Sequence, residues 1–573
     1  MSQHVVIIGA VALGPKAAAR FKRMEPGSRV TMIDRADVIS YGGCGIPYFV
    51  SGDVSDVSQL RETSFHMLRD EEFFRQTKGV DVFTGVEALS IDRHARRVRT
   101  RHVNSGKEGS LVYDKLVIAV GAAPRKLRLP GEDLTGVHYV SNLHDATRIH
   151  DAVSKGGVHK AVVVGAGFIG LEMAEALADM WGVQTTVVEL AGQIMPRYAS
   201  SALARMAMRH MEQHDVVFHL NEQVREIHGE NGKVTGLSTG ERTLEADMVI
   251  ISAGVIPNSR LAREAGLDVS CRGGIVVNTR LQTSDPCIFA GGDCVEIRHQ
   301  ITGDPFYLPM GSMANRQGRV IGTNLSGGTT QFEGAVGTFV VKLFEKSVAG
   351  TGLPLSTALD RGYDAVSVMI VQPDRAHFYP TKEPMTLELV FEKGTRRILG
   401  IQGFGGAGDA MVGRINSVAA MLKFRPTIED LSHLEMAYSP PFSSAMDILN
   451  SLGNMADNVL AGRNMVAGPE EFANLWGTGN GDGPYFLDCR EENDALTLLE
   501  LLGDRWHNIP QGRIRDRHDE IPRNKPIVIV CNTGARSYEA LIVLHDLGFK
   551  NLASVQGGMA ALTSYGAMGA DFA

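Results

Sequence analysis

Apolar runs of strand length alternate with glycine-rich turns and helical stretches along the first part of the chain. The run HVVIIGAVALG predicts a strand and a turn before an alanine-rich helix, and RVTMID predicts the next strand. The same order returns in KAVVVGAGFIG, LEMAEALADM and QTTVVEL. Two more strands, LVIAVGAAPRKLRLPG and MVIISAGVIPN, end in glycine turns at Gly121 and Gly254. This pattern predicts an α/β protein in which one structural unit occurs twice.

The second part of the chain changes its pattern twice. Residues 331–450 contain the alternating or apolar strands TFVVKLF, YDAVSVMIVQ, TLELVFEK and ILGIQGFG, and a helix is predicted around INSVAAMLK. The polar segment SLGNMADNVLAGRN, with scattered glycine and asparagine, predicts a linker over 451–463. A strand at YFLDC, a strand and loop at PIVIVCNTGARS and a helix at SYEALIVLHDLG then predict a last α/β domain over 464–573.

Composition places this pattern in a multidomain globular protein. A chain of 573 residues is too long for one hydrophobic core, and 44% hydrophobic with 21% charged residues is ordinary for globular proteins. The net charge of -8 argues against general nucleic-acid binding, and no apolar run reaches membrane-spanning length. The N-terminal run lacks the basic start and cleavage site of a signal peptide. Six sparse cysteines without a CxxC pair predict a reduced, cytoplasmic protein and no metal site.

The second glycine turn carries a full dinucleotide-binding pattern. Gly165, Gly167 and Gly170 follow a strand and open a helix, and Glu189 lies 19 residues after the last of them. The pyrophosphate of a dinucleotide binds backbone amides at such a helix N-terminus, and the acid accepts from a ribose hydroxyl. The Leu-Ala-Gly-Gln after Glu189 has no arginine for a 2′-phosphate, which favours NADH over NADPH.

The first glycine turn is a variant of this pattern. Val11 stands where the middle glycine is expected between Gly9 and Gly14. Asp34, which Arg35 follows, lies 20 residues after Gly14. Because two such units with their acids occur in one chain, we expect a flavin that receives electrons from a nicotinamide.

A single cysteine occupies the glycine-rich stretch SYGGCGIPYFV. Flavin enzymes that reduce sulfur often carry Cys-x4-Cys here, but Phe49 stands where the partner of Cys44 would be. The apolar IPYFV predicts a helix that starts just after the thiol and lowers its pKa. Alone, Cys44 must cycle through a sulfenic acid, a mixed disulfide or a persulfide, which leaves peroxide or oxygen, a small disulfide and a persulfide open as substrates. Peroxide-reducing relatives carry a histidine inside the first glycine turn, and this chain has none there.

Residues 1 to about 450 resemble the single-cysteine coenzyme A-disulfide reductases of the pyridine nucleotide-disulfide oxidoreductase superfamily. The matching pieces are GAVALG, SYGGCGIPY, ANRQGRVIGTN and AYSPPFSSAMDILN. The resemblance implies two Rossmann-like domains: a split FAD domain over 1–155 and 281–330, and an inserted NAD(H) domain over 156–280. It also implies an α+β dimerisation domain over 331–450, and therefore a homodimer. The stretch TSDPCIFAGGDC is similar to the flavoprotein segment whose acid, here Asp293, meets the ribityl and phosphate region of FAD.

The same resemblance assigns roles near the reactive sulfur. Two tyrosines of the partner subunit stand near the flavin in this family, and Tyr379 and Tyr438 match them. A phenol there would donate a proton to a leaving thiolate.

The resemblance also implies a coenzyme A site. Arg23 on the first helix, Ser40 before the cysteine and Lys78 match the family's contacts to the nucleotide and pantetheine. Gly43 replaces the family's asparagine, which removes one polar contact to the pantetheine arm.

A second sulfur site is predicted near the end of the chain. Residues 464–573 resemble a rhodanese domain, with the loop Cys531-Asn532-Thr533-Gly534-Ala535-Arg536 at the end of an apolar strand and before a helix. Successive backbone amides and a helix N-terminus make an anion cradle there, which favours the thiolate. Phosphatases of related shape use Cys-x5-Arg, and this Cys-x4-Arg loop better matches a persulfide on Cys531. Cys489, where an apolar residue is usual, is interpreted as structural.

We therefore expect an NADH- and FAD-dependent oxidoreductase that reduces a persulfide or polysulfide carried on a small thiol such as coenzyme A. Cys44 would attack the substrate, and Cys531 and Arg536 would handle sulfane sulfur. Three alternatives remain at this point: a coenzyme A-disulfide reductase with an accessory rhodanese, an NADH oxidase, and a slow redox-sensing or sulfur-carrier protein. The expected partners are small thiols and a second copy of the chain, with no nucleic acid or membrane.

Overall fold

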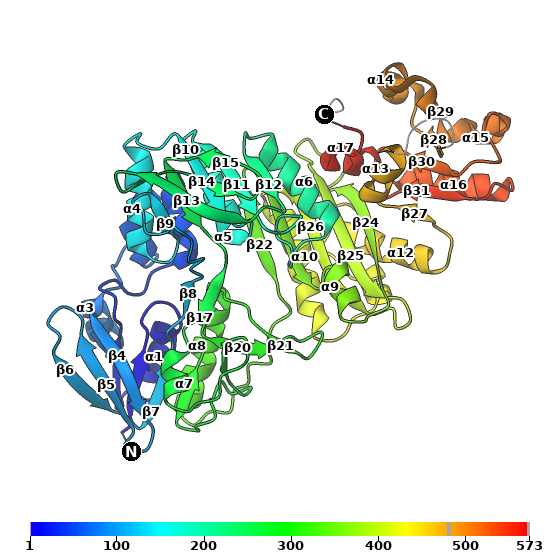
Figure 1. The fold of residues 1–573 in the computed structure, drawn as a ribbon. Coiled ribbons are helices and arrows are strands. Elements are labelled where there is room, and N and C mark those ends of the chain that lie inside the picture. The colour runs from blue at the N-terminus through cyan, green and yellow to red at the C-terminus, as the bar shows by residue number, and fades with distance from the viewer. Residues whose placement is uncertain (1, 478–482, 570–573) are drawn as a thin grey trace. The chain divides into compact units, whose positions relative to one another are not determined.

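The computed structural model describes residues 2–477 and 483–569. These residues form two compact units: the first comprises 2–190 and 221–335, and the second comprises 191–220 and 336–569. Helices and strands alternate through most of both units, so the predicted α/β class is confirmed (Figure 1). In the described part of the chain, no helix has the length and apolar character needed to span a bilayer.

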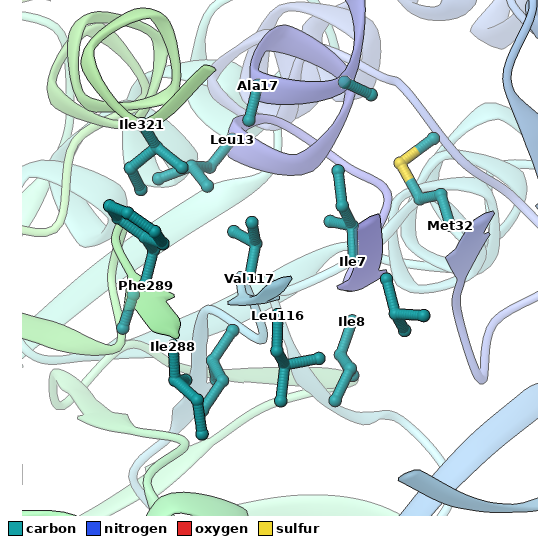
Figure 2. Close-up of a cluster of buried hydrophobic side chains, with 14 of the residues drawn as sticks. Ile7, Ile8, Leu13, Ala17, Met32, Leu116, Val117, Ile288, Phe289 and Ile321 are labelled. Carbon is teal, nitrogen blue, oxygen red and sulfur yellow. The ribbon is translucent and has the colours of Figure 1, made fainter. Parts of the chain in front are cut away.

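The first sheet of the first unit is parallel, with the order β19-β7-β1-β2-β3. Its strands are β1 (His4–Ile8), β2 (Arg29–Ile33), β3 (Asp81–Phe83), β7 (Lys115–Ile118) and β19 (Ile288–Ala290). Figure 2 shows part of the core around this sheet, where Ile7, Val117 and Phe289 lie side by side on neighbouring strands, and Phe289 comes from a much later part of the chain. The chain therefore leaves this sheet after β7 and returns to it at β19.

Two helices pack tightly beside this sheet. They are α1 (Leu13–Met24) and α8 (Gly311–Leu325). A Cβ on Gly318 would lie 2.8 Å from the carbonyl oxygen of Leu13, and one on Gly322 would lie 2.6 Å from that of Ala17. Only glycine allows the two backbones to approach this closely.

The second sheet of the first unit repeats the plan. Its neighbouring parallel strands are β11 (Gln184–Glu189), β10 (Lys160–Val164), β16 (Met248–Ile251) and β9 (Val137–Tyr139), and α5 (Phe168–Ala178) follows β10. The other helices of the unit are α2 (Ile46–Ser51), α3 (Glu71–Phe73), α4 (Leu143–Ser154) and α7 (Arg260–Glu264). Its smaller sheets are built from β4 (Val86–Asp92), β5 (Arg97–His102), β6 (Glu108–Val112), β8 (Ala122–Pro124), β13 (Val224–Glu230), β14 (Lys233–Thr239), β15 (Thr243–Glu245), β17 (Val255–Pro257), β18 (Ile275–Val276), β20 (Val295–Arg298) and β21 (Pro305–Phe306).

An antiparallel sheet with the order β22-β23-β26-β25-β24 forms the first part of the second unit. Its strands are β22 (Phe339–Leu343), β23 (Lys346–Gly352), β24 (Ala365–Pro373), β25 (Pro384–Glu392) and β26 (Ile398–Gly406), so the four predicted strands are present. The second unit also contains α6 (Ser201–Glu212), β12 (Val217–Leu220), α9 (Leu355–Asp360), α10 (Asp409–Leu422) and α11 (Ile428–Ser432). Helix α10 covers the predicted INSVAAMLK helix and begins earlier.

The segment predicted as a linker is mostly helical. Helix α12 (Ile448–Leu460) runs over it, and the carboxylate of Asp447 caps its first turn by accepting from the amide of Leu449. Leu449 and Leu452 are fully buried, and the helix contacts β24 and β25. The scattered glycine and asparagine hid an apolar face with helical spacing.

A parallel sheet with the order β27-β31-β30-β28-β29 ends the chain. Its strands are β27 (Val466–Ala467), β28 (Tyr485–Asp488), β29 (Trp506–Asn508), β30 (Ile527–Val530) and β31 (Leu552–Val555). The helices of this part are α13 (Pro469–Gly477), α14 (Glu492–Leu502), α15 (Ile514–Arg517), α16 (Ala535–Asp546) and α17 (Gly558–Tyr565).

Candidate active site

The two predicted dinucleotide loops have the same backbone geometry. Gly9 and Gly165 have φ of 108° and 104°, which L side chains rarely adopt. A Cβ on Gly14 would lie 2.0 Å from the carbonyl oxygen of Gly9, and one on Gly170 would lie 1.9 Å from that of Gly165. The first and last glycines of each loop are therefore required by the turn itself.

The predicted acids reach back to these loops. A carboxylate oxygen of Asp34 accepts from the amide of Ala10 at 2.7 Å, and one of Glu189 accepts from the amide of Ala166 at 2.7 Å. Each acid thus lies at the end of its strand and beside the residue after the first loop glycine. This is the position from which a carboxylate can meet the ribose of a bound dinucleotide.

The middle loop position differs between the two copies. A Cβ on Gly167 would meet no atom within 4 Å, so this position faces open space. Val11 can therefore replace a glycine in the first loop without strain, although its side chain stands where backbone would otherwise approach the pyrophosphate. Both loops fit a dinucleotide, and the second leaves more space beside its backbone because it has no side chain at the middle position.

The remaining predicted cofactor residues lie at the ends of strands. Gly121 and Gly254 both have positive φ, and the short strands that follow them, β8 and β17, pair with each other. Asp293 follows β19, and burial raises the pKa of its carboxyl to about 6. A Cβ on the nearby Gly291 would lie 2.5 Å from the side chain of Leu13, so this segment lies against the start of α1 and its glycine loop. Arg35 is exposed.

Cys44 lies at the middle of a single 3-10 turn, Gly43–Gly45, that leads into α2. A Cβ on Gly311 would lie 3.5 Å from its Sγ, and the amide of Gly311 donates a hydrogen bond to this sulfur. Gly311 is the first residue of the long helix α8. The helix N-terminus at the thiol is therefore that of α8, which arrives from 267 positions later in the chain.

The predicted direction of the Cys44 pKa is wrong. Desolvation by the surrounding protein raises the pKa of Cys44, although the residue keeps accessible surface. The amide of Gly311 opposes this rise, and the carboxylates of Glu172 and Asp293 add to it. The apolar helix α2 follows the thiol as predicted, but it does not determine the acidity.

Glu172 is a functional candidate that the sequence did not indicate. It lies on the first turns of α5, and desolvation followed by the charge of Glu175 raises the pKa of its carboxyl to about 7. Its charge acts on both Cys44 and Tyr48. A strongly shifted acid next to a reactive sulfur is typical of active sites. Its position two residues after Gly170 is visible in the sequence, but its electrostatic effect on Cys44 is not.

Phe49 occupies the position of the absent second cysteine as a core residue. It is 4% exposed, and its ring stacks on that of His150 at 4.6 Å between centroids. A cysteine at this point would lose that packing and leave a cavity.

Cys531 lies directly after β30 and before α16. The amide of Gly534, which has φ of 103°, donates to its Sγ at 3.1 Å. The thiol of Cys489, then the hydroxyl and amide of Ser537, and the amide of Gly534 lower the pKa of Cys531 to about 5, against the effect of burial. The predicted anion cradle therefore stabilises a thiolate here. Arg536 is half-buried on the first turn of α16.

Cys489 does more than fill space. It is fully buried at the end of β28, in the strand next to β30, as a structural residue would be. Its thiol has two acceptors in reach, the carbonyl of Val530 at 3.1 Å and the sulfur of Cys531. The contact with Cys531 raises the pKa of Cys489, so Cys489 keeps its proton, which it donates to the carbonyl of Val530. Only the pairing of the two strands shows this contact.

Comparison with known sequence families assigns the chain. The family "Pyridine nucleotide-disulphide oxidoreductase" matches residues 3–316, its dimerisation domain matches 338–449, and a rhodanese-like domain matches 469–564. The chain belongs to the pyridine nucleotide-disulphide oxidoreductases. The predicted fold classes and the predicted resemblance are thereby confirmed.

Individual proteins similar to this oxidoreductase act on sulfur. The NAD(P)H sulfur oxidoreductase (CoA-dependent) of Pyrococcus abyssi is 34% identical over 449 residues, covering 78% of this chain and 97% of that protein. The solved NAD-dependent persulfide reductase from A. fulgidus has a TM-score of 0.91 and 36% identity, covering 97% of this chain and 99% of that one. Bacillus anthracis CoADR-RHD has a TM-score of 0.88 and 31% identity, covering 99% and 98%.

FAD and a nicotinamide dinucleotide, the predicted cofactors, are those of this oxidoreductase family and are confirmed as its cofactors. The assignment of single residues to each cofactor stays a prediction, as does the preference for NADH.

The predicted coenzyme A residues lie in different settings of the first unit. Ser40 is buried with φ of 50°, and its amide donates to the carbonyl of Ala10 at 2.8 Å, which ties the cysteine turn to the first glycine loop. Gly43 and Arg23 are exposed. The ammonium of Lys78 lies 5.0 Å from the ring centroid of Phe73. Their contacts to coenzyme A stay predictions.

The two predicted tyrosines lie on neighbouring loops of the second unit. Tyr379 is half-buried between β24 and β25, and Tyr438 is 53% exposed before α12. The amide of Ala376 donates to the carbonyl of Pro440 at 3.2 Å, which joins the two loops. An exposed tyrosine on a tied loop of a dimerisation domain can serve a partner subunit, and this role stays a prediction.

Proposed function

We propose that this chain is an NADH-dependent flavoprotein that reduces a persulfide or polysulfide carried on coenzyme A or a similar thiol. The observation that carries the proposal is the pairing, in one chain, of an unpaired Cys44 at the N-terminus of α8 with a low-pKa Cys531 in a rhodanese loop. The sulfur and persulfide reductases to which the chain is similar support it.

The bound flavin and nicotinamide supply two electrons to sulfur. The thiolate of Cys44 attacks the inner sulfur of a persulfide R–S–SH, forming a Cys44–S–S–R disulfide and releasing HS⁻. Two electrons and one proton then return the Cys44 thiolate and free RSH. The amide of Gly311 holds the thiolate in place during both steps. A tyrosine from the partner subunit would protonate the leaving sulfur.

The buried Phe49 decides between this scheme and that of a dithiol enzyme. Because no resolving thiol stands at position 49, the disulfide formed on Cys44 must contain the substrate thiol. The enzyme therefore needs a site for that thiol's carrier, and coenzyme A suits the exposed Arg23 at the end of α1 through its phosphates.

Cys531 would take sulfane sulfur as its own persulfide and exchange it with the thiol carrier. Fusion to the reductase raises the effective concentration of that shared intermediate. We place the active form as a homodimer through the dimerisation domain, in the reduced cytoplasm, with small thiols as its other partners.

A coenzyme A-disulfide reductase is the second candidate, because Cys44 would form the same mixed disulfide with coenzyme A and because Bacillus anthracis CoADR-RHD is similar over the whole chain. NADH oxidation without oxygen, on coenzyme A persulfide and on coenzyme A disulfide, separates the two. We expect faster turnover on the persulfide, with HS⁻ formed mole for mole with NADH oxidised.

Cys44→Ser tests the role of the sulfur itself. It should lower turnover on either substrate by at least about a hundredfold. Normal turnover by this variant, or oxygen consumption that matches NADH oxidation without any sulfur acceptor, would contradict the proposal.

A further inference from the structure

A cluster of three side chains in the second unit has no part in the sulfur chemistry. His210 lies near the end of α6, His214 follows just beyond it, and Glu345 lies in the turn between β22 and β23. The ligand atoms of the three lie within 4.8 Å of one another. Nε2 of His214 is 3.1 Å from one oxygen of Glu345, and Nε2 of His210 is 3.4 Å from the other.

His210 is the member whose state requires an explanation. Its side chain is more than nine-tenths buried, yet its Nε2 makes no hydrogen bond within the described residues. Its contact with Glu345 therefore lacks hydrogen-bond geometry. The carbonyl of Leu343 accepts from the imidazole, and Nδ1 must be the donor because Nε2 is unbonded.

This arrangement leaves the lone pair of Nε2 directed at the cluster. A histidine whose Nδ1–H is bound to a backbone carbonyl and whose Nε2 is free has the orientation found in metal-binding histidines. An unsatisfied buried polar atom is costly, and a bound cation would satisfy it.

Aromatic packing fixes the rings around the cluster. The ring of His214 stacks on Phe344 with centroids 4.0 Å apart and planes 6° from parallel. The ring of His210 makes edge contacts with Phe344 and Phe404. Phe344 has φ of 56°, an unusual value for a bulky residue, in the turn that presents Glu345. Phe344 of the hairpin thus contacts the rings of both histidines, next to the residue that supplies the carboxylate.

We propose that His210, His214 and Glu345 bind one divalent transition-metal ion of the Zn²⁺ type and so clamp the end of α6 to the β22–β23 hairpin. Two imidazoles at i and i+4 with one carboxylate are a ligand set that Zn²⁺ uses, with water in the remaining position. A cavity of 440 Å³ borders Phe344 and Glu345, so the carboxylate of the cluster lies beside open space.

The ligand spacing requires only a small movement. Zinc bonds of about 2.0–2.2 Å place tetrahedral ligand atoms about 3.3 Å apart, whereas the widest separation here is within 4.8 Å. Glu345 is exposed, so its carboxylate can move toward the two imidazoles, which the aromatic rings hold in place.

Zinc binding to the full chain tests the proposal. The reactive thiols also bind Zn²⁺, so the titration uses protein carrying Cys44→Ser and Cys531→Ser, treated with chelator and dialysed. Calorimetry should show one Zn²⁺ per chain, and the melting temperature should rise with Zn²⁺ concentration. When His214→Gln or Glu345→Gln is added to this cysteine variant, each should weaken zinc binding by about a hundredfold and remove the rise in melting temperature.

Matched controls locate the effect. Glu383→Gln removes a nearby acid that pairs with Lys346, and His228→Gln removes a histidine of the first unit, so both should bind Zn²⁺ as before. Substitution of Co²⁺ should give an absorption spectrum of nitrogen and oxygen ligands without a thiolate charge-transfer band. Unchanged zinc affinity in both His214→Gln and Glu345→Gln, no saturable binding, or a thiolate band would overturn the proposal.

Discussion

Cys44 and Cys531, the two cysteines with a proposed role in sulfur chemistry, both lie at a helix N-terminus, and their pKa values are shifted in opposite directions. The sulfur of Cys44 lies beside Gly311, the first residue of α8, and Cys531 lies in the loop before α16. Desolvation and two carboxylates raise the pKa of Cys44, whereas the thiol of Cys489 and the donors of its own loop lower that of Cys531 to about 5. A helix N-terminus by itself therefore does not determine the pKa of a thiol. The number of donors and the sign of the nearby charges decide it.

This difference suits two tasks in one chain. The lowered pKa of Cys531 favours its thiolate, the form that attacks sulfane sulfur in the proposed transfer. The thiolate of Cys44 forms less readily, so its charge depends more strongly on the groups around it.

The largest expected effect is that of Cys531→Ser, which should separate sulfur transfer from NADH-dependent reduction. Cys531→Ser should reduce sulfane-sulfur transfer to cyanide by about a thousandfold or more, because no other described thiol lies in that anion cradle. The ratio of this activity to NADH-dependent coenzyme A-disulfide reduction should fall by the same factor. If sulfur transfer and polysulfide-dependent NADH oxidation are both unchanged, a joint role for the two cysteines is ruled out.

Removal of the Cys489 thiol should bring the pKa of Cys531 closer to that of Cys44. Cys489→Ala should raise the pKa of Cys531 from about 5 toward the ordinary thiol value, because the thiolate loses its strongest hydrogen bond. At pH 6 the thiolate fraction falls, so alkylation of Cys531 by iodoacetamide, followed by peptide mass spectrometry, should slow about tenfold. Cys489→Ser keeps a donor and should stay near the wild-type rate. An unchanged pH profile in the alanine variant would exclude this role of Cys489.

Removal of the Glu172 carboxylate should change the pKa of Cys44. Glu172→Gln takes a negative charge from beside Cys44 and should lower its pKa, so alkylation of Cys44 at pH 8 should accelerate about threefold. The carboxyl of Glu172 titrates near 7, so the two proteins should converge as the pH falls below that value and Glu172 gains its proton. Glu108→Gln, on the exposed strand β6, serves as the control. Equal rates at pH 8 would remove Glu172 from the site.

The smallest effect tests the amide of α8. Gly311→Pro removes the N–H that donates to Cys44 at a helix position where proline is tolerated, and Met310 before it already has extended backbone. The pKa of Cys44 should rise, and its alkylation at pH 8 should slow about twofold. Gly311→Ala keeps the amide and adds a Cβ at an ordinary 3.5 Å from the sulfur, so it should not slow alkylation. Equal rates in both variants would show that this amide is not used.

Much of the candidate site could be predicted because its signals are local. The glycine loops follow from the backbone conformations that Gly9 and Gly165 must adopt. The sequence also shows directly that Phe49 stands where a second cysteine would pair with Cys44. The direction of the Cys44 pKa could not be predicted, because its donor and its acids come from α8, α5 and the end of β19. Their distance from the thiol is a property of packing.

The sequence by itself determined the repeated strand–turn–helix units, the order of the domains and the turns that hold Cys44 and Cys531, because steric limits and hydrophobic periodicity act over a few residues. Only the tertiary structure decided which groups surround each sulfur, that Cys489 lies beside Cys531, that the expected linker is a helix, and that two histidines meet Glu345. Each of these depends on chain segments brought together by folding, and the electrostatic energies involved change steeply with distance.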